Sequence, residues 1–344
     1  MLLVGALPPP IGGVAVHVSR LAHALTGAAW HVEVCNTAMS PAGPEWVNEC
    51  RVWSGGRARN TVRLAHTLAK SKGLVAHWHV SPTGRTIPEL TTMAMMMRLA
   101  PSILTIHTGS FPDTMRTAAA STVRAVRSLC NACFAVVAVN ADIRTTLEDL
   151  DVRPRGGVHV IPPYVAQPAP LLPARPASAG PKQVISSGYA NAIYGWDVIA
   201  QAIASENVGE WHWVTYTEWD ETYMRPLIGA AERVAPGKLH LHRDLPPAAF
   251  NRLLAASDVY VRPTRADGDS IAVREALDLG VAVVASDVVT RPAGCVLFAT
   301  NDARDLAAAI ARAVPHVDNT HPKPSYAAAV IDLYRAALTG RKRS

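Results

Sequence analysis

The sequence is poor in several features that would mark other classes of protein. Only 17% of its 344 residues are charged, while 49% are hydrophobic, which excludes a largely disordered chain. The five cysteines are odd in number and scattered, so no disulfide framework of a secreted protein is indicated. No charge-free apolar run approaches the ~20 residues of a membrane-spanning helix. The apolar start lacks a basic segment and a cleavage site, so we expect a first core strand and a cytoplasmic protein.

Two short motifs suggest metal or redox chemistry but lack the partners that such chemistry needs. Cys130 and Cys133 form a C-x-x-C at the end of a helical pattern, with no second pair for zinc. We interpret them as buried structural thiols. His77 and His79 flank Trp78 on one predicted strand, but the sequence shows no third ligand beside them. We therefore expect no metal and no cofactor.

The excess positive charge lies in the first half of the chain. Residues 1–165 contain 15 Lys and Arg against 9 Asp and Glu, whereas the remaining residues contain 18 of each kind. The segment 51–72 holds six basic residues and no acid, and part of it has a helical pattern with an apolar side. A basic first half of the chain is suited to binding an acidic partner or an anionic surface. Aromatic residues are sparse around these cations, which argues against a nucleic-acid partner.

Short apolar runs alternate with helical patterns, and the alternation restarts after a stretch rich in Pro and Ala. Predicted strands are residues 2–7, 31–35, 75–79, 103–107, 135–139, 158–161, 183–187, 211–216, 239–241, 258–261 and 281–285. Apolar strands between amphipathic helices indicate parallel sheets covered on both faces. We predict an α/β protein with two Rossmann-like domains facing across a cleft. The domains are residues 1–165 and 182–322, joined by a linker at 166–181, and a C-terminal helix in 323–344 is expected to pack back on the first domain.

A loop and helix in the second domain carry the clearest chemical pattern. Asp267 lies at the loop edge, and Glu275 lies about one and a half turns into the helix that follows. The amides and dipole of a helix N-terminus favour phosphate and sugar oxygens. A carboxylate at position 275 can accept two hydrogen bonds from a ribose diol. Asp267 and Asp269 also form a D-x-D, which binds a divalent metal in some enzymes, but one of these two acids is already needed for the pair with Glu275.

This stretch resembles the retaining GT-B glycosyltransferases of family 4. Their signature is two acidic residues with seven between them, followed by an Ala-rich helix, a Gly turn and a strand, and residues 267–287 match it with Asp in place of the usual first Glu. The resemblance implies that Asp267 is a catalytic residue facing the donor sugar and that Glu275 holds the ribose. It implies that the residues between them bind the donor: Gly268, Asp269, Ser270 and Ile271.

The first half resembles the same family at two places. Gly12 and Gly13 join the first strand to the first helix, where His17 follows, and they are candidate donor-binding residues that allow a ligand close to the helix N-terminus. His107 ends the strand 103–107 and matches the family's catalytic histidine near the donor sugar. The resemblance thus runs through nearly the whole chain.

The turn after the first strand of the second domain departs from the family. Gly188 aligns, but Tyr189 and Tyr194 occupy the positions where the family carries two cations that neutralise the diphosphate. Losing such partners costs several kcal/mol of transition-state stabilisation in general. Arg265 and Arg274 are candidates to replace them. Further donor-binding candidates are the loop residues Arg243 and Asp244, expected near the base.

The resemblance implies a metal-independent, retaining glycosyltransferase. It would move a hexosyl or N-acetylhexosaminyl unit from a nucleotide diphosphate sugar, with UDP favoured, to a hydroxyl of a small-molecule, glycan or lipid-linked acceptor. The acceptor is expected on the basic first domain, where peripheral contact with an anionic membrane is one interpretation. The missing cations leave a second interpretation open: a non-catalytic nucleotide-sugar-binding homologue, or a partner subunit of another transferase.

Overall fold

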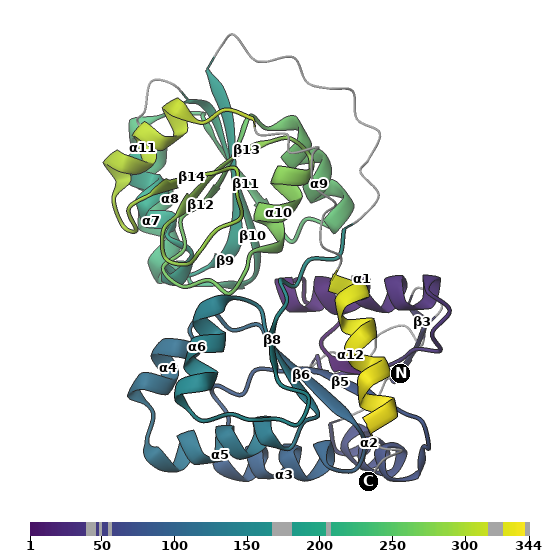
Figure 1. Ribbon diagram of the computed structural model, residues 1–344. Helices are drawn as coiled ribbons and strands as arrows, with labels where there is room; N and C mark the ends of the chain where they lie inside the picture. Colours follow the sequence, from purple (N-terminus) through teal and green to yellow (C-terminus); the bar gives the residue numbers. More distant parts are fainter. Residues whose placement is uncertain are drawn as a thin grey trace. The chain divides into compact units, whose positions relative to one another are not determined.

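The computed structural model describes residues 1–38, 46–47, 50–53, 57–166, 181–203, 208–315 and 326–340. The chain divides into two compact units, one formed by Met1–Val165 with Pro324–Ser344 and the other by Ala166–Lys323 (Figure 1). Most of the predicted linker lies outside the described residues. Within the described part, no helix combines the length and apolar character needed to span a membrane.

The first unit is built on a sheet with the strand order β3-β4-β2-β1-β5-β6-β7-β8, in which only the β3–β4 pair is antiparallel. Its elements are β1 (Leu2–Gly5), α1 (Gly13–Gly27), β2 (Glu33–Asn36), β3 (Trp46–Val47), β4 (Cys50–Trp53), α2 (Arg57–Lys70), β5 (Ala76–His79), α3 (Ile87–Met97), β6 (Ser102–Ile106), α4 (Phe111–Thr117), α5 (Ala120–Asn131), β7 (Ala135–Ala138), α6 (Ala141–Asp149), β8 (Val158–Val160) and α12 (Tyr326–Gly340). The sequence patterns missed β3, which has only two residues, and β4, whose apolar residues are interrupted by the exposed Arg51.

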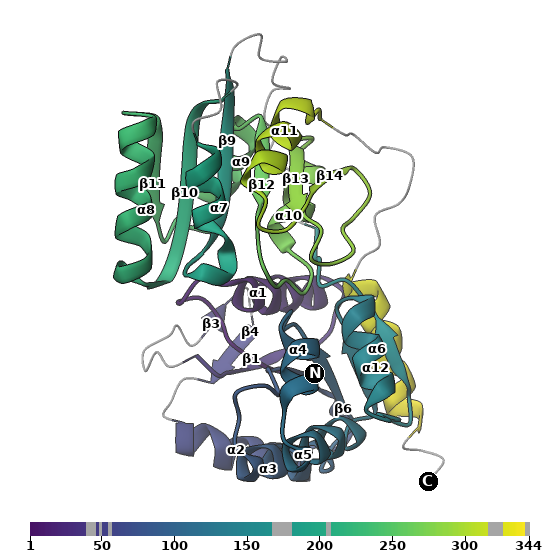
Figure 2. The same ribbon diagram turned by 90° about the vertical axis from the view of Figure 1, so that its left-hand side faces the viewer.

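Both faces of this sheet are covered, because successive strand residues point to opposite sides. Leu2 and Val4 pack with helices α2 to α6, while Leu3 packs with α1 and α12 in a separate cluster. Helix α12 comes from the far end of the sequence and lies beside α1 in both views (Figures 1 and 2). It contributes the buried Tyr326 and Tyr334 to this second layer.

The second unit contains a fully parallel sheet with the order β11-β10-β9-β12-β13-β14. Its elements are β9 (Lys182–Ala190), the 3-10 turn η1 (Ala192–Tyr194), α7 (Trp196–Ala202), β10 (Val208–Trp219), α8 (Glu221–Val234), β11 (Leu239–Arg243), α9 (Pro247–Ala256), β12 (Val259–Arg262), α10 (Ile271–Asp278), β13 (Ala282–Ser286), β14 (Cys295–Phe298) and α11 (Ala303–Arg312). The strand β14 was not expected from the sequence.

The helices of the second unit also form two layers. Trp211 and Trp213 on β10 pack with α7, α8 and α11, whereas Val214 packs with α9 and α10. Strand β9 lies inside the sheet, with β10 and β11 on one side of it and β12, β13 and β14 on the other. In open parallel sheets, ligands bind at the carboxyl ends of the strands beside such a switch point. The loops after β9 and β12 are therefore the place to look for a site.

We predict that the Tyr334 hydroxyl fastens α12 to the first sheet. This buried hydroxyl lies 2.6 Å from His77 Nδ1, so Tyr334→Phe leaves a buried nitrogen without its partner. The free energy of unfolding in urea should fall by about 1–3 kcal/mol. Arg335→Gln, one residue along at an exposed position, should change it by less than about 0.5 kcal/mol. Equal stabilities of the two variants would contradict the proposed role of this hydrogen bond.

Candidate active site

Helix α10 begins at the carboxyl end of β12, after a loop that turns through Gly268. Ser270 is its N-cap, and the hydroxyl oxygen accepts a hydrogen bond from the amide of Val273 at 3.4 Å. The helix starts with Ile271, as the family pattern predicts. Its remaining amides and its dipole give this end a positive character. The loop and the first turn thus form an anion-accepting end of the sheet.

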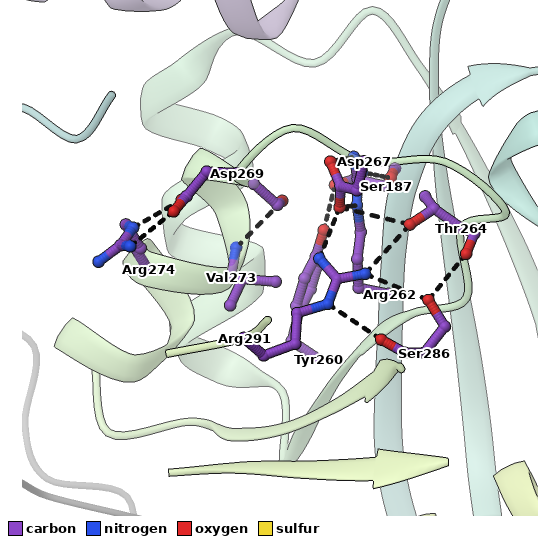
Figure 3. A network of polar contacts seen from close by, with 11 residues as sticks. Ser187, Tyr260, Arg262, Thr264, Asp267, Asp269, Val273, Arg274, Ser286 and Arg291 are labelled. Carbon is purple, nitrogen blue, oxygen red and sulfur yellow. Dashed lines mark hydrogen bonds and ion pairs between the residues drawn. The ribbon is translucent and has the colours of Figure 1, made fainter. Parts of the chain in front are cut away.

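Asp267 is the centre of a buried charge network in this loop. Arg262 donates to it through Nε at 2.9 Å and Nη2 at 3.1 Å, and Arg291 Nη1 donates to it at 2.7 Å (Figure 3). The side chains of Asp267 and Arg291 are only 7% and 2% exposed. Burial by itself would raise the pKa of Asp267, but the two guanidinium groups outweigh it and hold that pKa well below its usual range. Asp267 is therefore an ionised carboxylate, and the three side chains carry one net positive charge.

The network joins three neighbouring strands. Arg262 ends β12 and also donates through Nη1 to the Ser187 carbonyl of β9 at 3.0 Å. Arg291 follows β13 and donates to the Ser286 carbonyl at 3.0 Å. Thr264 lies between them and donates to Asp267 at 3.3 Å. The loop after β12 is thus tied to the strands on both of its sides.

The two arginines that we expected to replace the missing cations are both held by carboxylates. Arg274 pairs with Asp269 through two hydrogen bonds of 2.6 Å (Figure 3). Arg265 pairs with Asp197 of α7 through hydrogen bonds of 2.9 Å and 2.6 Å. Burial raises the pKa of Asp269 although Arg274 binds it. Both pairs are charge-neutral, so neither adds net positive charge to the site.

The turn after β9 brings the two unexpected tyrosines together. Their rings pack edge to face with centroids 5.5 Å apart, and Tyr194 lies so close to Gly188 that a Cβ on this glycine would stand 1.9 Å from the ring. The Arg262 guanidinium lies over the Tyr194 ring, 5.1 Å from its centroid. Burial raises the pKa of Tyr194 to about 12, so it is a neutral hydroxyl. Positive charge therefore reaches this turn from β12.

Glu275 and the loop after β11 complete the second unit's candidates. Glu275 is buried in α10, and its carboxyl group adds to the rise in the pKa of Tyr216 that burial causes. Arg243 ends β11 with its guanidinium stacked on Trp219, 4.5 Å from the ring. Asp244 follows with a positive φ of 50°. These two residues lie at the same carboxyl edge as Asp267, on the outermost strand of the sheet.

The remaining candidates belong to the first unit. His107 directly follows β6, and its Nε2 lies 3.1 Å from His79 Nδ1. Gly12 is the N-cap of α1 in extended conformation, and a Cβ on Gly13 would meet nothing within 4 Å. These three residues lie at the carboxyl ends of β1 and β6.

The C-x-x-C thiols are buried, as expected. Cys130 and Cys133 are free thiols, and burial raises the pKa of Cys130 to about 12. A thiol with so high a pKa carries little thiolate at neutral pH and is a poor nucleophile or metal ligand. The structural interpretation is confirmed.

Sequence reasoning missed Arg262 and Arg291, although one signal was present. Arg262 is a charged residue at the end of a strand otherwise buried, directly before Pro263. Such a residue needs a carboxylate partner, and Asp267 is the first acidic residue after it in the sequence. Arg291 lies 24 positions from Asp267 and only the folded loop after β13 brings it there.

Comparisons with known proteins agree on the family. The protein-family model described as Glycosyl transferases group 1 matches residues 184–315. The family model of the Glycosyl transferase 4-like domain matches residues 12–164. A sequence search of curated proteins gives no match. Among solved structures, HepE from Anabaena in complex with UDP-glucose is 15% identical, with 90% of this chain and 88% of that chain covered at a TM-score of 0.67.

The solved structures of two synthases are similar to this chain to about the same degree. Sucrose-phosphate synthase from Thermosynechococcus elongatus is 17% identical, with 98% of this chain and 94% of that chain covered at a TM-score of 0.67. An α,α-trehalose-phosphate synthase from Burkholderia xenovorans, in complex with glucose-6-phosphate, is 13% identical, with 98% and 97% covered at a TM-score of 0.66. At these identities the likeness establishes the fold, which is GT-B with two Rossmann-like domains.

We predict that Asp267→Asn destabilises the second unit strongly, because it leaves two arginines buried without their carboxylate. The free energy of unfolding at neutral pH should fall by about 3–5 kcal/mol. Asp332→Asn removes a carboxylate that is 78% exposed, and it should change stability by less than about 1 kcal/mol.

The pH dependence of this effect has a definite sign. The pKa of Asp267 in the folded state lies below the unfolded value of about 3.9. Its contribution is therefore complete above that value and is lost as the pH falls through the folded-state pKa. The stability difference between wild type and Asp267→Asn should stay constant from about pH 8 to about pH 5 and shrink in stronger acid. A difference that shrinks near neutral pH would show that another group controls it.

Proposed function

Because the chain belongs to the glycosyl transferases group 1 family and is a glycosyltransferase that uses nucleotide-sugar donors, we propose that it transfers a hexosyl or N-acetylhexosaminyl unit from a UDP-sugar with retention of the anomeric configuration. One observation carries the proposal. The acidic pair Asp267 and Glu275 frames a Ser270-capped helix end at the switch point of the second sheet. UDP is favoured because UDP-glucose is bound in HepE, which has the same fold.

The donor would lie along this helix end. Glu275 would accept hydrogen bonds from the ribose hydroxyls, and the loop amides around Gly268 would bind sugar and phosphate oxygens. Arg243 and Asp244 would lie toward the base. The buried position of Glu275 strengthens its hydrogen bonds, because the surrounding dielectric is low.

Charge stabilisation of the leaving diphosphate is assigned to Arg262. Arg265 and Arg274 are neutralised by their carboxylates, whereas the network of Arg262, Asp267 and Arg291 retains one net positive charge. Arg262 also lies over Tyr194, which occupies the position of a family cation. A preorganised cation in a buried site stabilises developing negative charge at little cost in reorganisation. The reaction would then need no metal.

Asp267 and His107 would act on the donor sugar. Asp267 has to hold Arg262 in place, and its Oδ1 accepts one hydrogen bond in the network, which leaves capacity for a sugar hydroxyl. The pKa of His107 is lowered by burial, so its imidazole is neutral at pH 7 and can accept or donate a hydrogen bond. The retained configuration would follow from attack on the donor face that carries the diphosphate.

The donor can be identified by ligand-induced stabilisation. Melting temperatures of the full chain with UDP, GDP, ADP and dTDP should rise most with UDP, because only a ligand of the native state stabilises it. Incubation with UDP-sugars should then give slow hydrolysis, and NMR of the released sugar should show the α-anomer from an α-linked donor. No stabilisation by any of these nucleotides would contradict the proposed site.

We predict that Glu275→Ala weakens UDP binding by at least about tenfold, since a hydrogen bond to a charged group contributes roughly 1.5–3 kcal/mol. Isothermal titration calorimetry gives the affinity. Glu232→Ala on the exposed side of α8 is the matched control and should bind UDP as the wild type does. Unchanged affinity in Glu275→Ala would remove this residue from the donor site.

The acceptor is proposed to bind the basic first unit. Helix α2 carries the exposed Arg59, and Arg63 lies over Trp53 at 4.3 Å from the ring. Val62 on the same helix is 71% exposed, so apolar and cationic groups share one surface. This combination suits an anionic or lipid-linked acceptor.

We predict that the basic surface of α2 binds anionic vesicles. Co-sedimentation with vesicles rich in phosphatidylserine should fall when Arg59 and Arg63 are both changed to Gln, by roughly 1 kcal/mol for each cation near the surface. Arg144→Gln on α6, whose charge is paired with Glu148, should have little effect. Binding that does not respond to charge would favour a small soluble acceptor.

A further inference from the structure

Three histidines from separate elements of the first unit converge on one point. His17 comes from α1, His79 ends β5 and His107 follows β6. The ring centroids of His17 lie 5.0 Å from those of His79 and His107, and the latter two are 5.4 Å apart. Each histidine offers one ring nitrogen, and these three nitrogens all lie within 4.8 Å of one another. The sequence offered only His77 and His79 as a pair, whereas the fold joins His79 to His17 and His107 instead.

The hydrogen bonds of His17 fix which of its nitrogens has a lone pair. Its Nδ1 lies 2.9 Å from the Pro163 carbonyl oxygen, which can only accept, so Nδ1 carries the proton. Its Nε2 is buried and has no hydrogen-bond partner among the described residues. An imidazole that donates one N–H to a carbonyl and presents the other nitrogen as a lone pair is the usual arrangement of a metal ligand. A buried lone pair without a partner is also costly unless something binds it.

His79 and His107 already stand at the right separation. Nδ1 of His79 and Nε2 of His107 are 3.1 Å apart. Two nitrogens bound to one tetrahedral Zn²⁺ ion lie about 3.4 Å apart, since each Zn–N bond is about 2.0 Å. Metal binding through Nδ1 places the proton of His79 on Nε2, a buried atom that has no partner in the described part of the chain. Ligation by this pair therefore requires a change of tautomer and a small movement.

A fourth histidine lies at the same edge of the sheet but is excluded as a ligand by its hydrogen bonds. His77 packs against His79, but Tyr334 and Thr105 occupy both of its nitrogens at 2.6 Å and 2.7 Å. It supports the cluster without facing an ion.

We propose that His17, His79 and His107 form a binding site for a divalent transition-metal ion of the Zn²⁺ type. Three imidazoles without a carboxylate suit Zn²⁺ or Co²⁺ and do not suit Mg²⁺ or Ca²⁺, which prefer oxygen ligands. Three protein ligands leave a fourth coordination position for water or for an oxygen of a bound molecule. The proposal concerns ion binding by the first unit alone and does not depend on the transfer reaction proposed above.

Titration of the chelator-treated full chain with Co²⁺ tests the site. Wild type should bind one ion with the visible ligand-field absorption of tetrahedral cobalt, and Zn²⁺ should displace it. His17→Asn and His107→Asn should each weaken binding by more than about tenfold, because loss of even a supporting group costs about that much. Added Zn²⁺ should raise the melting temperature of the wild type and leave that of each variant unchanged.

A second histidine trio provides the matched control. His212, His240 and His242 lie together in the second unit, with His212 Nδ1 and His242 Nε2 at 3.2 Å. His242→Asn should leave the cobalt spectrum and the Zn²⁺-induced stabilisation intact. The proposal is overturned if wild type shows no tetrahedral cobalt spectrum, or if His242→Asn abolishes it while His17→Asn and His107→Asn do not. Since His107 is only partly buried, its variant remains informative if His17→Asn fails to fold.

Discussion

The carboxylate of Asp267 is shared by Arg262 and Arg291 in the interior of the second unit, where water cannot compensate their charges. Two buried cations repel each other, so the loop after β12 has to place an anion between them. That requirement fixes the path of residues 263–270, and with it the start of α10. Tyr194, whose ring lies against Gly188 of β9, then packs under the guanidinium of the same Arg262.

The network also explains how the chain can depart from its family at the turn after β9. Tyr189 and Tyr194 bring no charge to this turn, but Arg262 comes from the adjacent strand and stacks on one of them. Positive charge is thus present at nearly the same place while its origin in the sequence differs. The neighbouring pairs Arg265–Asp197 and Arg274–Asp269 stiffen the loop and leave the net charge of the site unchanged.

Two histidines of the first unit lie at the carboxyl ends of neighbouring parallel strands. His79 ends β5 and His107 directly follows β6, and the two lie close together because parallel neighbours end at the same edge. Helix α12 supplies Tyr326 and Tyr334 beneath them, where their hydroxyls lie 2.8 Å from Thr105 Oγ1 and 2.6 Å from His77 Nδ1 respectively. The last helix of the sequence therefore helps to organise the edge of the first sheet.

The sequence alone determined the alternation of strands and helices, the two parallel sheets and the acidic pair formed by the loop residue Asp267 and by Glu275 of α10. These features depend on local periodicity and fixed spacing, which need no knowledge of distant contacts. Only the tertiary structure decided that Arg291 reaches Asp267, that Arg265 and Arg274 are neutralised, and that His17 and His107 join His79. The strands β3, β4 and β14 were likewise recognised only from their pairing at the edges of the two sheets. Charge pairing and ligand geometry act through space, so residues far apart in the chain acquire their roles only when the sheet brings their strands side by side.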